Sequence, residues 1–211
     1  MSQELLKIAI DAALQAAKKI VEIYKSDDFD IQLKSNDSPL TKADIASHNI
    51  IESYLKETQI PILSEEGKDI PYDIRKKWSR LWIVDPIDGT KEFIKRNGEF
   101  TVNIALVENQ LPTIGVIYAP ILNDLYFSSH ALGAYKVKVD LDNYSVASLI
   151  ENGIQLPIER QEDRYTIVAS RSHLSSETDD FIDEMKSKHG DIYMISKGSS
   201  LKICMVAEGL A

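Results

Sequence analysis

Apolar residues recur every three or four positions through the first part of the chain. Between Leu5 and Ile23 charged residues separate them, a pattern typical of an amphipathic helix that covers a sheet. A second apolar stripe follows Thr41, which stands where a helix cap would stand, and predicts a helix ending near Thr58. Two helices are therefore expected before the first strand.

The pattern then changes to short runs rich in β-branched and aromatic residues. These runs span residues 60–64, 81–84, 101–107, 114–118, 125–128 and 134–139. We expect them to form one mostly antiparallel sheet. A polar segment, residues 140–164, predicts a connection between two parts of the molecule.

Strands and helices return beyond this connection. The pattern predicts a strand at 165–169, a helix at 175–188, a short run at 192–195 and a final helix at 199–207. We therefore divide the chain into an amino-terminal α/β part, residues 1–155, and a carboxyl-terminal α/β part, residues 156–211.

Composition and charge narrow the choice of function. The 211 residues are 44% hydrophobic, which is enough for a buried core, and 24 Lys and Arg against 33 Asp and Glu give a net charge of −9. A chain of that charge has no overall positive field to attract a nucleic-acid polymer or an anionic membrane. The sequence shows no membrane span and no leader pattern, and it has a single cysteine, Cys204. We expect a cytoplasmic protein without an internal disulfide.

The most informative stretch is LWIVDPIDGTKEF. An apolar strand ends in Asp85, Pro86 interrupts strand pairing, and Gly89 with Thr90 begins a helical turn. Asp85 and Asp88 then share one tight turn, and hard oxygen ligands of this kind suit Mg²⁺ together with a substrate phosphate. The N–H groups of Gly89 and Thr90 would favour an anion at the same place. The alternative is that Asp-Pro and Asp-Gly are ordinary turn dipeptides.

Two further acidic stretches add context. Glu65 and Glu66 follow the predicted strand at 60–64 as Asp85 follows its own strand, so neighbouring strand ends could bring three or four carboxylates together. Such a cluster repels itself unless a cation is bound. Asp44 in TKAD would lie in the first turn of a helix, where the helix dipole favours a carboxylate. Taken alone, the glutamate pair fits a solvated turn and TKAD fits a helix cap.

Taken together and in this order, these stretches resemble the Mg²⁺-dependent, lithium-sensitive phosphatases of the inositol monophosphatase superfamily. The resemblance spans nearly the whole chain. Its segments are SPLTKAD (38–44), LSEE (63–66), WIVDPIDGTKEFIKRNGEFTVNIAL (82–106), GVIYAP (115–120), SRSH (170–173) and GSSLKICMVAEG (198–209). Lys91, Glu92 and Phe93, which follow DPIDGT, are similar to the bacterial 3'(2'),5'-bisphosphate nucleotidase branch rather than to inositol-phosphate enzymes.

The resemblance implies a fold and a set of catalytic roles. The fold is α+β, a layered αβαβα sandwich of the sugar-phosphatase type, with the metal site in the amino-terminal part. Asp44 and Thr90 would be catalytic, because together they would orient and activate the attacking water. The expected ligands of two or more Mg²⁺ ions are Glu65, Asp85, Asp88 and the carbonyl of Ile87.

The resemblance also implies a substrate site to which both parts contribute. Its expected members are Glu65, Ile87, Asp88, Gly89, Thr90, Ser170, His173, Ser199 and Lys202. Among them, Lys202 would balance the phosphate that is not cleaved. Without the resemblance, His173 fits a surface turn and Lys202 a solvated helix position. Cys204, on the apolar side of the final helix, fits a buried inert thiol.

The implied reaction removes the 3'-phosphate of adenosine 3',5'-bisphosphate to give AMP and phosphate, and it is linked to sulfate assimilation. The alternatives are an inositol monophosphatase and a nucleotide-binding module with little turnover. The expected partner is a small nucleotide, not a nucleic-acid polymer. Peripheral association with the inner face of the cell membrane and the oligomeric state stay open.

One departure from the family pattern concerns the carboxyl-terminal part. Relatives continue through a Trp-Asp-x-Ala-Ala-Gly segment whose Asp binds the second metal, and the sequence to Ala211 does not contain it. We therefore expect an incomplete last layer and a weak second metal site. Leu201 and Val206 of the final helix should be exposed. Loss of that ligand would lower turnover more than nucleotide affinity.

Overall fold

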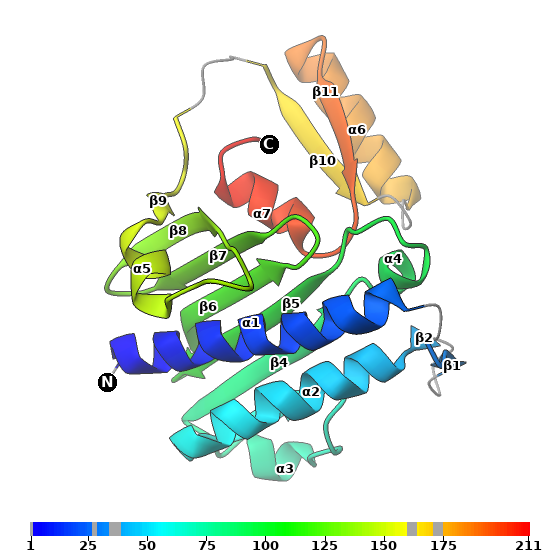
Figure 1. Ribbon diagram of the computed structural model, residues 1–211. Helices are drawn as coiled ribbons and strands as arrows, with labels where there is room; N and C mark the ends of the chain where they lie inside the picture. The colour runs from blue at the N-terminus through cyan, green and yellow to red at the C-terminus, as the bar shows by residue number, and fades with distance from the viewer. Residues whose placement is uncertain (1, 27–28, 34–38, 160–163, 171–174) are drawn as a thin grey trace.

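The chain folds into five layers in the order α, β, α, β, α (Figure 1). The structure is a computed structural model that describes residues 2–26, 29–33, 39–159, 164–170 and 175–211. The layers are α1 (Ser2–Lys25) with α2 (Lys42–Leu55), then a seven-stranded sheet, α7 (Leu201–Ala207), the pair β10 (Thr166–Ser170) and β11 (Tyr193–Lys197), and α6 (Ser176–His189). This order confirms the α+β layered fold.

The large sheet carries the strands in the order β3-β4-β5-β6-β7-β8-β9. Its strands are β3 (Ile62–Ser64), β4 (Arg80–Asp88), β5 (Thr101–Glu108), β6 (Leu111–Ala119), β7 (Asp124–Ser129), β8 (Gly133–Lys138) and β9 (Ile154–Gln155). Strands β3 and β4 are parallel and the other neighbours are antiparallel, which confirms a mostly antiparallel sheet. The shorter elements are β1 (Gln32–Leu33), β2 (Pro39–Leu40), η1 (Lys56–Thr58), α3 (Tyr72–Arg75), α4 (Thr90–Ile94) and α5 (Val146–Glu151).

Helix α1 forms the centre of the core. Its small residues allow it to approach both α2 and the sheet closely. The fully buried alanines are Ala9, Ala12, Ala13, Ala16 and Ala17, each 0% exposed. Along β5, Val102, Ile104 and Leu106 are buried in the same core, whereas alternate residues face the other side of the sheet. Among the helices of the described residues, none is long and apolar enough to cross a membrane.

The described part of the polar segment, residues 140–159 and 164, includes secondary structure that the sequence does not predict. It contains α5 and β9, and β9 pairs with β8 through Tyr135↔Gln155 and Lys136↔Ile154. Leu149 of α5 is 7% exposed and joins the main core. Helix α5 has six residues and β9 has two, so their apolar residues form no periodic pattern, because periodicity needs several turns to show. The division of the chain after residue 155 remains a prediction.

Helix α7 lies with one side against the large sheet. Leu201 and Cys204 stand one turn apart and are 4% and 2% exposed, so the expected exposure of Leu201 is wrong. Val206 is exposed as expected, at 55%. Burial raises the pKa of the Cys204 thiol to about 12, which confirms a buried, protonated cysteine.

Candidate active site

Asp44 lies in the first turn of α2 and is 1% exposed. Its Oδ2 accepts hydrogen bonds from the Thr41 backbone N–H at 2.8 Å and from the Thr41 hydroxyl at 2.6 Å, which forms a capping box. Its Oδ1 accepts a hydrogen bond from the Thr90 hydroxyl at 3.1 Å. The helix-cap interpretation is therefore right, and the same carboxylate also contacts Thr90.

The same face of α2 contacts two other turns of the site. Ser47, three residues after Asp44, donates its hydroxyl to the Pro86 carbonyl at 2.9 Å. His48 Nδ1 lies 2.9 Å from the Ser64 hydroxyl at the end of β3. Residues three and four positions apart share a helix face, so α2 holds the ends of β3 and β4 in fixed positions.

The backbone at the end of β4 places Asp85, Asp88 and the start of α4 on the same side of the sheet edge. Pairing of β4 with β5 lapses between Asp85 and Asp88 and resumes at Asp88↔Thr101. The interruption predicted at Pro86 is therefore present, although the strand continues to Asp88. Gly89 then adopts φ +94° at the start of α4. Only glycine takes this conformation without strain, so the turn depends on it.

Parallel pairing brings Glu65 to the same edge of the sheet. Ser64 stands opposite Val84, and the Glu65 N–H donates to the Val84 carbonyl at 3.0 Å. The parallel pairing therefore ends at Ser64 and Val84, and the next residues, Glu65 and Asp85, lie side by side. This is the juxtaposition of strand ends that the sequence predicts.

An open pocket of about 660 Å³ collects most of the predicted residues. It is lined by Pro39, Glu65, Asp85, Asp88, Gly89, Thr90, Lys91, Glu92, Asn103, Ser170, Gly198, Ser199, Ser200, Lys202 and Ile203. Asp44 lies behind Thr90, and the side chain of Ile87 is buried at 2% exposed. His173 lies outside the described residues.

The acidic residues of this pocket shift one another's pKa values. Burial, followed by the charges of Glu65 and Asp88, raises the pKa of Asp85 to about 8. Burial also raises the pKa of Asp88, although the Ser200 N–H and the Lys202 ammonium act in the opposite direction. The carboxylates are thus held together at an electrostatic cost that a cation would relieve.

The chemistry of these residues fits a divalent metal ion. Asp85 Oδ1 is buried and has no hydrogen-bond donor within the described part of the chain. Carboxylate and carbonyl oxygens are the ligands that Mg²⁺ prefers. The described residues contain no group of three His, Cys, Asp or Glu side chains that forms a ready-made metal site. Glu65, Asp85, Asp88 and the Ile87 carbonyl are the groups that could hold the ion.

Ser200 is a site residue that the sequence analysis missed. Its N–H donates to Asp88 Oδ2, and its hydroxyl lies 2.8 Å from the Thr101 hydroxyl and 3.1 Å from Asn103 Oδ1. Ser200 thus joins the loop before α7 to β5 and to the turn after β4. No local sequence pattern marks this residue, because its contact with Asp88 uses a backbone N–H and spans 112 positions.

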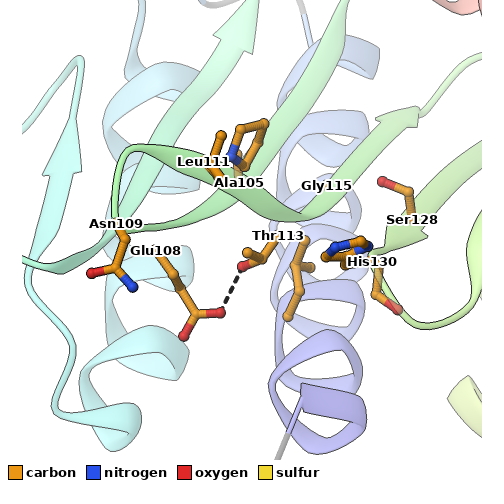
Figure 2. A pocket seen from close by; sticks show the side chains of 11 residues that line it. Ala105, Glu108, Asn109, Leu111, Thr113, Gly115, Ser128 and His130 are labelled. Carbon is orange, nitrogen blue, oxygen red and sulfur yellow. Dashed lines mark hydrogen bonds between the residues drawn. The ribbon is translucent and has the colours of Figure 1, made fainter.

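A larger pocket lies at the other end of β5 (Figure 2). Its volume is about 780 Å³, and none of the predicted site residues lines it. Glu108 there accepts a hydrogen bond from the Thr113 hydroxyl at 2.9 Å and pairs with Arg80 at 2.7 Å. Its carboxylate is neutralised by these contacts, so the smaller pocket with its acidic cluster is the candidate active site.

Comparison with known proteins agrees with this geometry. The inositol monophosphatase family matches residues 1–211, and the chain belongs to that family. Proteins of the family are generally metal-dependent phosphatases, which is consistent with the oxygen ligands at the pocket.

The sequence identity to individual relatives shows which branch of the family the chain resembles most. The chain is 42% identical over 211 residues to the 3'(2'),5'-bisphosphate nucleotidase CysQ of Salmonella typhimurium, covering 98% of this chain and 78% of the relative. The crystal structure of CysQ from Bacteroides thetaiotaomicron has a TM-score of 0.88 at 49% identity, covering 99% of this chain and 78% of that chain. An IMPase from Thermotoga maritima shares the fold, with a TM-score of 0.75 at 22% identity and coverage of 97% and 73%. The resemblance to the nucleotidase branch is confirmed.

Proposed function

We propose that the chain is a Mg²⁺-dependent phosphatase that converts adenosine 3',5'-bisphosphate into AMP and phosphate. The observation that carries the reaction type is the hydrogen bond from Thr90 to Asp44, 3.1 Å, beside a pocket lined by carboxylates. The choice of nucleotide rests on the 42% identity to a protein named a bisphosphate nucleotidase. The reaction would recycle a by-product of sulfate assimilation.

In this proposal, Asp44 and Thr90 prepare the attacking water. Asp44 accepts the Thr90 proton in a hydrogen bond, which leaves the lone pairs of the Thr90 oxygen to accept a hydrogen bond from water. The water oxygen bonds to phosphorus while the bond to the 3' oxygen breaks, and overall one proton moves from the water to that oxygen, which becomes the 3'-hydroxyl of AMP. No covalent phosphoenzyme is needed. The N–H groups of Gly89 and Thr90, in the first turn of α4, would donate to the phosphoryl oxygens.

The acidic residues would hold two or more metal ions. Glu65, Asp85, Asp88 and the Ile87 carbonyl would be the ligands. Bound Mg²⁺ would make the attacking water more acidic and offset negative charge on the phosphate.

The phosphate that is not cleaved would meet the start of α7. Lys202 Nζ donates to the Ser199 carbonyl at 2.7 Å, which holds the ammonium group beside the pocket. Ser170 lines the same pocket from the end of β10. We propose that these residues bind the nucleotide, together with His173, whose contribution is inferred from the sequence alone.

The two alternative functions have less support. An inositol monophosphatase would fit the fold, but the identity to the Thermotoga IMPase is 22% against 42% and 49% for the CysQ proteins. A nucleotide-binding module without turnover would not need the Asp44–Thr90 contact.

The test measures phosphate release from adenosine 3',5'-bisphosphate and from inositol 1-phosphate. We expect faster release from the nucleotide, dependence on Mg²⁺ and inhibition by lithium. Activity that a chelator leaves unchanged would contradict the metal assignment. Equal rates on both substrates would favour an inositol monophosphatase, and nucleotide binding without release would favour the binding module.

A further inference from the structure

Glu99 is a buried carboxylate to which no role has yet been given. It lies between α4 and β5 and is 7% exposed. Its Oε2 accepts a hydrogen bond from the Gly198 N–H at 2.8 Å, and its Oε1 lies 3.3 Å from Lys197 Nζ. These partners stand 99 and 98 positions further along the chain. The side chain therefore joins the segment after the catalytic turn to the segment before α7.

The backbone of Glu99 fills the space between two glycines. A Cβ on Gly89 would lie 3.0 Å from the Glu99 carbonyl oxygen, and a Cβ on Gly198 would lie 3.1 Å from the same atom. A Cβ on Gly198 would also come within 2.7 Å of Glu92 Cγ. Glu99 is thus packed between the turn that begins α4 and the loop that precedes α7, and neither glycine has room for a side chain.

The loop held by Glu99 carries the proposed phosphate-binding groups. Ser199 adopts φ +49°, a conformation that costs energy for a residue with a side chain and needs support from its surroundings. Ser200 donates its N–H to Asp88, and Lys202 donates to the Ser199 carbonyl. A charged acceptor gives a stronger hydrogen bond than a neutral one. The contact from Glu99 to Gly198 therefore favours this single shape of the loop.

We propose that Glu99 is a positioning residue that sets the substrate specificity of the enzyme. By fixing residues 197–202, it places Lys202 and Ser199 where a second phosphate on the substrate would lie. The inference rests on the proposed function for its substrate, but the contact between Glu99 and Gly198 is independent of it. Glu99 acts through the loop and touches no reacting atom.

Two variants test this role. Glu99→Gln keeps the shape of the side chain and removes its charge, whereas Gly198→Ala pushes the loop away from Glu92 and Glu99 without changing either carboxylate. The matched control is Glu108→Gln, a partly buried carboxylate on the far end of β5 with its own partners. Thermal unfolding of each variant shows whether the fold is kept.

The main measurement compares adenosine 3',5'-bisphosphate with adenosine 3'-monophosphate, which lacks only the second phosphate. We expect Glu99→Gln to raise KM for the bisphosphate about tenfold, the scale of one charge-assisted hydrogen bond, and to change KM for the monophosphate less than about twofold. The kcat should change less than about threefold for both substrates. Gly198→Ala should act in the same direction, and Glu108→Gln should change neither KM. An equal loss on both substrates would overturn the proposal.

A second measurement keeps the two proposals separable. Hydrogen exchange of the nucleotide-free protein should be at least about tenfold faster at residues 197–203 in Glu99→Gln and Gly198→Ala, and unchanged in Glu108→Gln. If the unmodified protein releases no phosphate, the proposed function fails, and exchange alone tests the positioning of the loop. Exchange that stays at the unmodified rate would overturn the role of Glu99.

Discussion

The two carboxylate oxygens of Asp44 bind different partners: Oδ2 accepts from Thr41 and Oδ1 accepts from Thr90. The contribution of Asp44 to stability and its contribution to catalysis can therefore be measured separately. Replacement by Asn keeps an acceptor for the Thr41 N–H but alters the group that faces Thr90. We expect Asp44→Asn to lower kcat by about 100-fold or more, in the range of general acid–base contributions, with a small change in melting temperature. Steady-state kinetics and thermal unfolding measure the two effects.

Thr90 provides the control for this prediction. Thr90→Ser keeps the hydroxyl that donates to Asp44 and should keep most of the activity, whereas Thr90→Val removes the hydroxyl and should resemble Asp44→Asn. Near-normal turnover in Asp44→Asn would remove Asp44 from the catalytic pair.

The raised pKa of Asp85 predicts an unusual dependence of the free energy of unfolding on pH in the metal-free protein. Its pKa is raised from an ordinary value of 3.8 to about 8, chiefly by burial. Between these values the folded chain binds more protons than the unfolded chain, so the free energy of unfolding falls as pH rises. The carboxylate is therefore most destabilising above about pH 8, where it is ionised in both states.

Asp85→Asn should remove much of this dependence. In the presence of a chelator, we expect the variant to be more stable than the unmodified protein near pH 8, with a flatter slope between about pH 4 and pH 8. The raised pKa of Asp88 leaves a residual slope of the same sign. Urea unfolding across this pH range is the measurement, and parallel curves for the two proteins would contradict the cause given for Asp85.

At the scale of residues, the sequence predicts that Asp44, Asp85 and Thr90 lie close together because strand ends and helix caps leave local patterns, and the structure places them around one pocket. It missed Ser200 and Glu99 for a physical reason. Ser200 meets Asp88 across 112 positions, and the contact uses a backbone N–H that every non-proline residue has. No local pattern records such a partner.

Among the elements, α7 is fixed to the large sheet by a buried polar network. Glu208, directly after the helix, is 4% exposed and accepts hydrogen bonds from the Tyr126 hydroxyl at 2.7 Å and from Lys136 Nζ at 2.8 Å. Burial and the neighbouring Glu208 raise the pKa of Tyr126, so its hydroxyl stays a donor. Lys136 also lies 3.6 Å from Asp124, which completes the network.

Removing the centre of this network should destabilise the protein. We expect Glu208→Ala to lower the free energy of unfolding by about 2 kcal/mol or more, because it leaves Lys136 and Tyr126 without their buried partner. Lys138→Ala is the control, since that side chain is 71% exposed and its ion pair with Asp124 should contribute about 1 kcal/mol or less. Urea unfolding compares the variants. Equal losses in the free energy of unfolding would show that the network adds nothing to stability beyond a surface ion pair.

The observed elements that the sequence does not predict are short. The long helices and strands repeat an apolar pattern over several turns or pleats, so the sequence predicts them. Helix α3 has four residues and β9 has two, too few for any repeat to appear. The position of β9 is set by its pairing with β8, which a local pattern does not record.

Across the whole molecule, buried apolar residues are distributed unevenly. Helix α1 buries eleven residues in the main core, whereas α6 buries Ile182 and Met185 alone. We expect native-state hydrogen exchange to show that α6 opens at a lower free energy than α1, because fewer apolar contacts oppose its opening. A single opening free energy for both helices would instead indicate one cooperative unit.

The parallel pairing of β3 with β4 has a consequence for the evolution of this chain. Two consecutive glutamates follow β3, and the register Ser64↔Val84 places Glu65 beside Asp85. Deletion of one residue in β3 would place Glu66 where Glu65 stands, and insertion of one residue would place Ser64 there and remove the carboxylate from the site. The long connection from Gly67 to Ser79 lies outside this register and can change length without moving either strand end. Descendants of this sequence should therefore accumulate length changes in that connection and conserve the spacing from Ile62 to Glu65.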